Sequence, residues 1–129
     1  LRNLSLAPDR EVVSAEQIER IIAIYGALGM GDLVCRYRRS LGAAASADFP
    51  LSRSEALLTG IVRCLMMEPR VLLLDGCFSG MAPEYVDRVV RYLDREFSAT
   101  TLIYASHAAN DYFTYSRTFR IHNGRLQAA

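Results

Sequence analysis

The sequence predicts an α/β fold in which parallel strands are covered by helices and preceded by a helical region. Residues 71–74 form an unbroken apolar run between Pro69 and Gly76, which is typical of a strand covered on both faces. Residues 99–105 form a second run rich in β-forming residues. Apolar residues also recur at helical spacing before each run, so the order of elements favours two parallel strands joined through a helix.

The first region, residues 1–50, is predicted to be helical, and residues 51–129 to form the α/β part. Ser14 and Gln17 have the spacing of a capping box. The apolar residues that follow share one helix face: Ile18, Ile21, Ile22 and Tyr25. This helix should end at residues 28–31, which include two glycines.

A shorter helix is expected next, with Asp32 as its N-cap. The alanine- and serine-rich residues 41–49 are predicted to form a loop, and residues 1–13 a lead-in with a turn at Pro8-Asp9. Three arginines of the shorter helix fit either a solvated face or a docking patch: Arg36, Arg38 and Arg39.

A second capping box, formed by Ser52 and Glu55, predicts a helix that begins within residues 51–55 and continues to about Met67. The start of a helix presents unpaired N–H groups and the positive end of the helix dipole, and both favour an anion. Arg53 fits this environment as an anion contact, and it fits equally an exposed arginine without such a role.

The apolar run of residues 71–74 ends on an acid, Asp75. A carboxylate at the carboxyl end of a buried strand lies where open α/β sheets bind their ligands. In that position Asp75 could orient the water shell of a Mg²⁺ ion that is bound to phosphates. The alternative is a strand that simply stops at a turn.

Pro83 suits the first turn of the next helix. One face of that helix carries Val86, Val89, Val90, Leu93 and Phe97, and Asp87 can pair with Arg91 on the exposed side. His107 then follows the predicted strand of residues 99–105, where it could donate a hydrogen bond to a phosphate or serve only the structure.

At the C-terminal end, the dipeptide Asn123-Gly124 predicts a β-hairpin. His122 should be a surface side chain of that hairpin. The aromatic residues before it are expected to be core residues on a short helix: Tyr112, Phe113 and Tyr115.

Composition excludes several classes of protein. The 15 cationic and 14 anionic residues nearly cancel, so no net charge points to nucleic acid. All the cations are arginines, so the chain lacks the phosphate-binding loop G-x-x-x-x-G-K-[ST]. The three cysteines show no C-x-x-C spacing and are expected to be reduced. The absence of a long apolar run or a signal-peptide pattern favours a cytosolic protein, and the start at Leu1 suggests a fragment.

Several short motifs now stand in one order: LSRSE at 51–55, RVLLLD at 70–75, SGM at 79–81 and SH at 106–107. In this order and spacing the chain resembles the C-terminal half of an ABC-type ATPase, the nucleotide-binding subunit of ABC transporters. The resemblance covers roughly residues 12–126. It implies a partial P-loop NTPase-like domain preceded by a helical subdomain that lies against a membrane-spanning partner.

The resemblance also implies roles for individual residues. The signature segment would contact the γ-phosphate of ATP held on a second ABC ATPase subunit; its residues are Leu51, Ser52, Arg53, Ser54 and Glu55. Asp75 would serve the Mg²⁺ ion, and His107 would be the catalytic switch histidine. The implied cofactors are ATP and Mg²⁺, and the implied partners are a membrane permease and a second ATPase subunit at the cytoplasmic face of the membrane, with no nucleic acid.

The chain departs from the family pattern at several positions. Arg53 and Ser54 stand where the family usually has two glycines, Gly76 where hydrolytic members have a glutamate, and Ala82 where an aspartate is expected. Loss of one general acid–base group lowers a rate by about 10²- to 10⁴-fold. Whether the chain is an enzyme is therefore open.

Three hypotheses follow. The chain is part of an active transporter ATPase that obtains its phosphate loop and carboxylate from elsewhere, or part of a subunit that does not hydrolyse ATP, or a regulatory interaction module that binds no nucleotide. We favour the second, because Asp75 and His107 are present and the glutamate is not.

Overall fold

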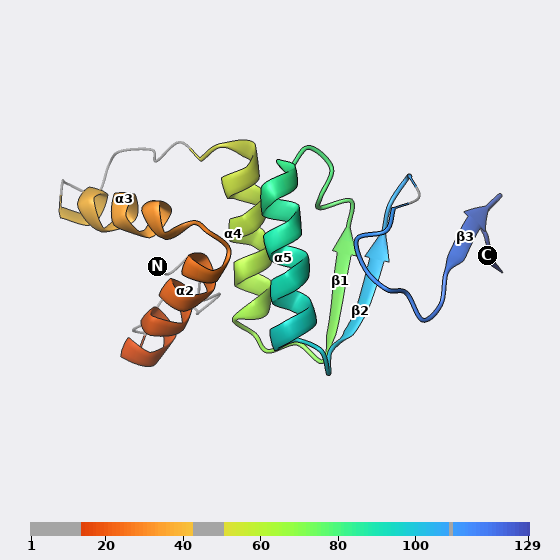
Figure 1. Ribbon diagram of the computed structural model, residues 1–129, viewed down its shortest axis with the longest axis horizontal. Helices are drawn as coiled ribbons and strands as arrows, with labels where there is room; N and C mark the ends of the chain where they lie inside the picture. Colours follow the sequence, from red (N-terminus) through yellow and green to blue (C-terminus); the bar gives the residue numbers. More distant parts are fainter. Residues whose placement is uncertain (1–13, 43–50, 109) are drawn as a thin grey trace.

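The computed structural model describes residues 14–42, 51–108 and 110–129, and the side chains of residues 37–42 fall outside this description (Figure 1). No helix in these ranges has both the length and the apolar character needed to cross a lipid bilayer. The elements follow one another as α2 (Ala15–Ala27), α3 (Gly31–Gly42), α4 (Arg53–Leu65), β1 (Val71–Asp75), α5 (Pro83–Glu96), β2 (Thr101–Ala105), β3 (Phe119–His122) and β4 (Arg125–Ala128).

Helix α2 begins at the predicted capping box. The Ser14 hydroxyl accepts a hydrogen bond from the Gln17 backbone N–H at 3.1 Å, and the Gln17 side chain accepts one from the Ser14 N–H at 2.9 Å. The buried face of α2 consists of Ile21, Ile24 and Tyr25. The helix ends before Gly29, whose positive φ of 74° is the left-handed conformation that commonly stops a helix.

Helix α3 differs from its prediction at both ends. It begins at Gly31, so Asp32 lies within the first turn and is not the N-cap. A carboxylate in the first turn is still favourable because it faces the positive end of the helix dipole. The helix continues to Gly42, so the predicted loop of residues 41–49 is wrong at its first two residues. The remainder of that loop and the turn at Pro8-Asp9 lie outside the described residues.

Strands β1 and β2 are parallel, as predicted, with Leu72 opposite Leu102 and Leu74 opposite Tyr104. The prediction that β1 is covered on both faces is wrong. Leu72 and Leu74 are each 4% exposed, whereas Val71 is 58% and Leu73 63% exposed. The sheet has two strands in the described chain, and its core contacts lie on one side alone, so alternate side chains face solvent.

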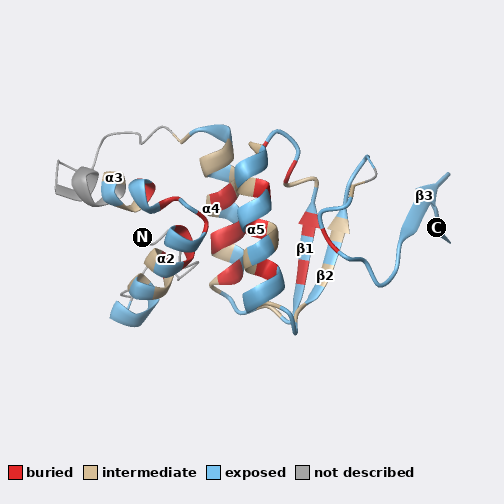
Figure 2. Ribbon diagram, in the orientation of Figure 1, coloured by how far each residue is buried: buried red, intermediate tan, exposed pale blue. Residues whose placement is uncertain are grey.

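The covered face of this sheet packs on helices α4 and α5 in a single hydrophobic core (Figure 2). Leu58, Val62 and Leu65 of α4 and Val89 of α5 are fully buried, and α2 joins the same core through Ile21 and Ile24. Each buried aliphatic side chain of this size contributes roughly 1.5–3 kcal/mol. An α/β architecture with helix-covered parallel strands is thus confirmed for one face of the sheet.

Helix α5 and the C-terminal hairpin follow their predictions closely. Pro83 occupies the first turn of α5, and Asp87 accepts a hydrogen bond from Arg91 at 3.1 Å. The hairpin turns at Asn123 and Gly124, which both have positive φ as a type I′ turn requires. His122 is an exposed residue of β3, as expected.

The aromatic segment before the hairpin contains no helix, which corrects its prediction. Phe113 is buried, whereas Tyr112 and Tyr115 are 39% and 38% exposed. Phe78 draws this segment onto the sheet, because its ring lies 5.3 Å from both the Tyr104 and the Tyr112 rings. The order here comes from aromatic contacts between distant segments and not from helical periodicity.

Candidate functional site

Two of the predicted site residues lie at the carboxyl edge of the parallel sheet. Asp75, the last residue of β1, is opposite Ala105, the last residue of β2. The Gly76 N–H donates a hydrogen bond to the Ala105 carbonyl at 2.9 Å, so the pairing extends past both strands. His107 lies two residues beyond Ala105. Because Asp75 and His107 are both exposed at this edge, both can reach a ligand that lies over it.

Gly76 stands where the family resemblance predicts a glutamate in hydrolytic members, and its backbone makes the turn after β1. Its φ of 54° is in the left-handed region, and its carbonyl accepts a hydrogen bond from the Ser79 N–H at 3.0 Å. A Cβ atom built on Gly76 would meet no atom within 4 Å apart from its chain neighbours. The position therefore has room for a Cβ atom, at a conformational cost of roughly 1–2 kcal/mol.

Cys77 does not replace the missing carboxylate. Burial raises the pKa of its thiol to about 11, and the negative charge of Asp75 acts in the same direction. The thiol is therefore protonated at neutral pH, and a protonated thiol is neither a base nor a nucleophile. Apart from Asp75 itself, the described residues of the turn after β1 thus supply no general base.

The second part of the site is the start of α4, where the predicted signature segment lies. The Ser52 hydroxyl accepts from the Glu55 N–H at 3.2 Å, and the Glu55 carboxylate accepts from the Ser52 N–H at 2.7 Å. This backbone hydrogen bond is the main reason that the pKa of Glu55 is lowered, and an ion pair with Arg36 of α3 lowers it further. The second capping box is therefore also a link between two helices.

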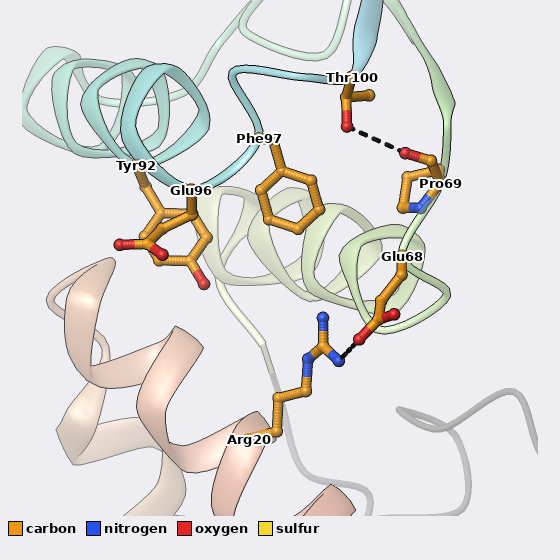
Figure 3. Close-up of a pocket in the computed structure, with 7 residues that line it drawn as sticks. All are labelled: Arg20, Glu68, Pro69, Tyr92, Glu96, Phe97 and Thr100. Atoms are coloured by element: carbon orange, nitrogen blue, oxygen red, sulfur yellow. Dashed lines mark hydrogen bonds and ion pairs between the residues drawn. The ribbon is translucent and has the colours of Figure 1, made fainter.

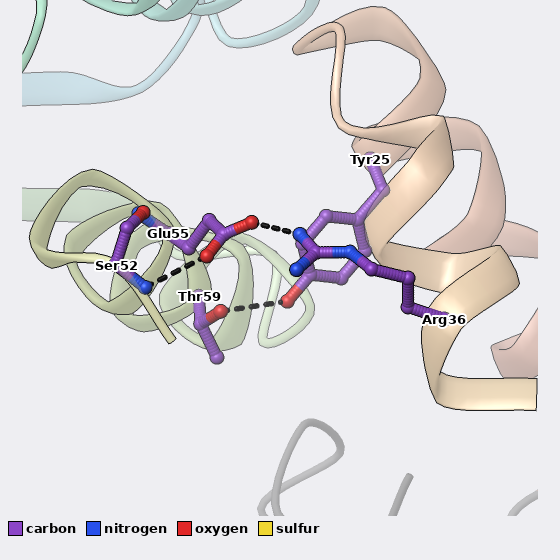
Figure 4. A network of polar contacts seen from close by, with 5 residues as sticks. All are labelled: Tyr25, Arg36, Ser52, Glu55 and Thr59. Atoms are coloured by element: carbon purple, nitrogen blue, oxygen red, sulfur yellow. Dashed lines mark hydrogen bonds and ion pairs between the residues drawn. The ribbon is translucent and has the colours of Figure 1, made fainter. Parts of the chain in front are cut away.

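Figure 4 shows this link from close by, with the guanidinium of Arg36 directed at the Glu55 carboxylate. Beside it, the Tyr25 hydroxyl of α2 donates to Thr59 Oγ1 of α4 at 3.0 Å. Both contacts tie the helical region to the helix that carries the predicted signature segment. The position of the α4 start is thus fixed from outside the helix as well as by its own cap.

Arg53 and Ser54, the two positions where the resemblance predicts glycines, contact the loop that follows β1. A Cβ atom built on Gly80 would lie 2.9 Å from Nε of Arg53, so the guanidinium lies directly over that glycine. The Ser54 hydroxyl accepts a hydrogen bond from the Ala82 N–H at 3.4 Å. The start of α4 therefore packs on residues 80–82 of its own chain, in the loop that follows Asp75.

A magnesium ion fits this edge only together with a nucleotide. Among the described residues no group of three or more histidine, cysteine, aspartate or glutamate side chains is placed to hold a metal ion. Magnesium is often bound through one or two carboxylates, several waters and the phosphates of a substrate. Asp75 alone is adequate for that arrangement.

A separate pocket of about 430 Å³ lies at the opposite end of the sheet (Figure 3). Pro69 and Thr100, which precede β1 and β2, belong to its lining, together with Arg20, Glu68, Tyr92, Glu96 and Phe97. Glu68 has a positive φ of 48° and pairs with Arg20. The pocket contains none of the predicted site residues, and it is at the amino ends of the strands, away from Asp75.

The chain is 23% identical over 122 residues to the ABC transporter gloK of Glarea lozoyensis; the match covers 95% of this chain and 9% of the transporter. It also superimposes on the crystal structure of the ADP conformation of MJ1267, an ATP-binding cassette of an ABC transporter, with a TM-score of 0.64 and 18% identity. That match covers 93% of this chain and 44% of the cassette. The chain has the fold of part of an ABC nucleotide-binding domain.

No family model matches the sequence. The chain spans less than half of the solved cassette and about a tenth of the transporter, so it is a partial ABC nucleotide-binding fold. The expected resemblance and the α/β class are confirmed at this level. The roles of Asp75, His107 and residues 51–55, and the division of the chain after residue 50, stay predictions.

Two features of the site were missed in the sequence. The first is the ion pair between Arg36 and Glu55, although the arginines of the second helix were recognised as a candidate patch. The second is the left-handed backbone of Gly76, which a glycine directly after a strand could have indicated. Both matter because they fix the backbone at the two parts of the site.

Proposed function

We propose that the chain is the nucleotide-contacting C-terminal part of an ABC transporter ATPase, which couples ATP binding to transport through a membrane permease. The observation that carries this proposal is the carboxyl edge shared by β1 and β2. Asp75 ends β1 there, His107 lies two residues past the end of β2, and both residues are exposed. In parallel sheets this edge is where ligands bind. The similarity to an ABC transporter and to an ATP-binding cassette supports the same assignment.

Each predicted residue has a role that its environment permits. Asp75 would orient the water ligands of a Mg²⁺ ion held by the phosphates of ATP, and His107 would donate a hydrogen bond to the γ-phosphate. The capped start of α4 would contact the phosphates of ATP on a second ATPase subunit through its N–H groups and Arg53. Residues 1–50 would lie against the permease at the cytoplasmic face of the membrane.

We further propose that this part hydrolyses ATP poorly. Gly76 offers no carboxylate to the attacking water, and the thiol of Cys77 is protonated at neutral pH. A subunit of this kind would bind nucleotide and would leave hydrolysis to its partner subunit.

Restoring the carboxylate tests this proposal. The Gly76→Glu variant of the intact gene product that contains residues 1–129 should hydrolyse Mg-ATP about 10²- to 10⁴-fold faster than the wild type. The Gly76→Gln variant is the matched control, because it carries the same left-handed strain and nearly the same shape without the charge. Hydrolysis is measured as phosphate release, and Mg-ATP binding by calorimetry. Equal rates for the two variants would contradict the assignment of Gly76 to the catalytic position.

The second candidate function is a regulatory interaction module that binds no nucleotide. It is favoured by the absence of a phosphate loop from residues 1–129 and by the substitutions at Gly76 and Ala82. Calorimetry separates the two functions, because the module predicts no heat of Mg-ATP binding for the wild type or for either Gly76 variant.

A further inference from the structure

The backbone beside His107 is held by a chain of side-chain hydrogen bonds. The Ser106 hydroxyl accepts from the Ala108 N–H at 3.3 Å, and the Ala108 carbonyl accepts from the side-chain amide of Asn110 at 3.2 Å. The side-chain oxygen of Asn110 in turn accepts from the Tyr115 hydroxyl at 2.6 Å. Both backbone polar groups of Ala108, the residue after His107, are therefore bound by side chains, although no helix or strand is formed there.

Tyr115, at the end of this chain of hydrogen bonds, is anchored by aromatic contacts. Its ring lies 6.2 Å from the ring of Phe113, which is buried. The Phe113 ring lies 6.0 Å from that of Tyr104 in β2 and 6.1 Å from that of Phe78 in the loop after β1. Ring pairs at these separations are favourable contacts. The hydrogen-bond chain is therefore supported by both halves of the carboxyl edge.

The Tyr115 hydroxyl is a donor at neutral pH. Burial raises its pKa above the ordinary tyrosine value, so the hydroxyl keeps the proton that it donates to Asn110. Tyr112 offers a contrast in the same aromatic cluster. It is as exposed as Tyr115, and its ring lies 5.3 Å from that of Phe78. Its hydroxyl forms no hydrogen bond with the described residues.

His107 can contact a phosphate only while its backbone stays at the carboxyl edge of the sheet. A segment without regular structure that is ordered only on binding loses conformational entropy at that moment, which lowers affinity. We infer that Tyr115, acting through Asn110 and Ala108, is a positioning residue that holds His107 in place before the nucleotide arrives. This inference rests on the proposed function, because it assigns Tyr115 to the phosphate contact of His107.

The order of the His107 backbone tests the inference without any nucleotide. Labelling with ¹⁵N-histidine gives two backbone amide signals, because residues 1–129 contain only His107 and His122. The order parameter of His107 should be about 0.85 in the wild type and below about 0.6 in Tyr115→Phe, which keeps the ring and removes the hydroxyl. His122 is the internal reference and should not change. Tyr112→Phe is the matched control and should leave both signals unchanged.

Asn110→Asp tests the middle of the hydrogen-bond chain. A carboxylate can still accept from Tyr115, but it cannot donate to the Ala108 carbonyl. This variant should therefore lower the order parameter of His107 as Tyr115→Phe does.

Mg-ATP binding by the intact gene product that contains residues 1–129 is then measured by calorimetry. Tyr115→Phe should weaken binding about two- to tenfold, the range that corresponds to one hydrogen bond. Tyr112→Phe should leave the affinity unchanged. In a His107→Ala background, Tyr115→Phe should have no further effect, because its effect is exerted through the His107 side chain.

An unchanged order parameter of His107 in Tyr115→Phe would overturn the inference, and so would an equal loss of order in Tyr112→Phe or at His122. Equal losses of affinity from Tyr115→Phe with and without the His107 side chain would also overturn it. Absence of Mg-ATP binding by the wild type would reject the proposed function. A loss of order confined to His107 would still show in that case that Tyr115 positions this residue.

Discussion

The two faces of the β1–β2 sheet are built from the same kinds of residue and have opposite environments. Leu72 and Leu74 lie in the core, and Val71 and Leu73, their neighbours in the sequence, lie in solvent. Nothing in the local sequence distinguishes the two pairs, because all four belong to one apolar run. The difference shows that apolar character makes a residue suitable for burial, whereas the elements packed around the strand decide whether it is buried.

The largest effect is expected from truncating one side chain on each face of β1. Leu74→Ala should lower the free energy of unfolding of the chain by about 2–5 kcal/mol, because it leaves a cavity among the residues of α4 and α5. Leu73→Ala should change it by less than about 0.5 kcal/mol, because that side chain has few contacts to lose. Urea unfolding followed by circular dichroism measures both values. Equal losses of unfolding free energy in the two variants would mean that the face that carries Leu73 is covered in solution.

The features that were predicted correctly from the sequence depend on residues close together in the chain. The capping boxes at Ser14 and Ser52 each involve a partner three residues away, and the turn at Asn123-Gly124 is set by two adjacent residues. The helix of residues 83–96 was also predicted correctly, since its apolar residues recur at helical spacing within a single element.

The features that were missed depend on distant residues. The exposure of Leu73 depends on which helices pack on the sheet. The ion pair of Glu55 depends on an arginine 19 residues earlier. The position of Phe113 depends on its contacts with Phe78 and Tyr104. For the site, the sequence placed Asp75 and His107 at one sheet edge correctly. It could not show that the start of α4 packs on the loop after β1, because that contact joins Ser54 to Ala82.

A smaller effect is expected at Cys77, which packs against the covered side of the structure. Its raised pKa means that the folded state favours the protonated thiol. This contribution to stability is fully present below the ordinary thiol pKa of about 8.5 and is lost as the pH rises through the folded value of about 11.

Two measurements check this expectation. Iodoacetamide should modify Cys77 at least tenfold more slowly than the exposed Cys64 at pH 8, with the sites resolved by mass spectrometry. The free energy of unfolding should fall between pH 8.5 and 11 by more in the wild type than in Cys77→Ala. Similar modification rates at the two cysteines would show that Cys77 is accessible to solvent and not packed against the core.

The smallest effect is expected from the polar link that holds α3 to the covering helix α4. Arg36→Ala should lower the free energy of unfolding by roughly 0.5–1 kcal/mol at neutral pH, since the pair is partly exposed. The lowered pKa of Glu55 implies stability that is present above its ordinary pKa of about 4.3 and is lost as the pH falls through the folded value.

Unfolding curves of the wild type and of Arg36→Ala between pH 7 and pH 3 measure this contribution. The two proteins should converge in stability as Glu55 becomes protonated. Arg36→Lys is the control, because it keeps the charge and should lose less. A difference that persists at pH 3 would show that Arg36 stabilises the chain by packing and not through the Glu55 carboxylate.

Among the described residues β1 pairs with β2 alone, and its other edge gives Asp75 a consequence unrelated to any nucleotide. An unpaired strand edge beside an apolar face is a template for aggregation, and natural proteins oppose it with charged gatekeeper residues at the ends of such strands. Arg70 and Asp75 flank the apolar run of β1 in this manner. Removing the Asp75 charge, as any study of magnesium binding would do, therefore also removes a gatekeeper, and losses of soluble protein in such variants report on colloidal stability as much as on the site.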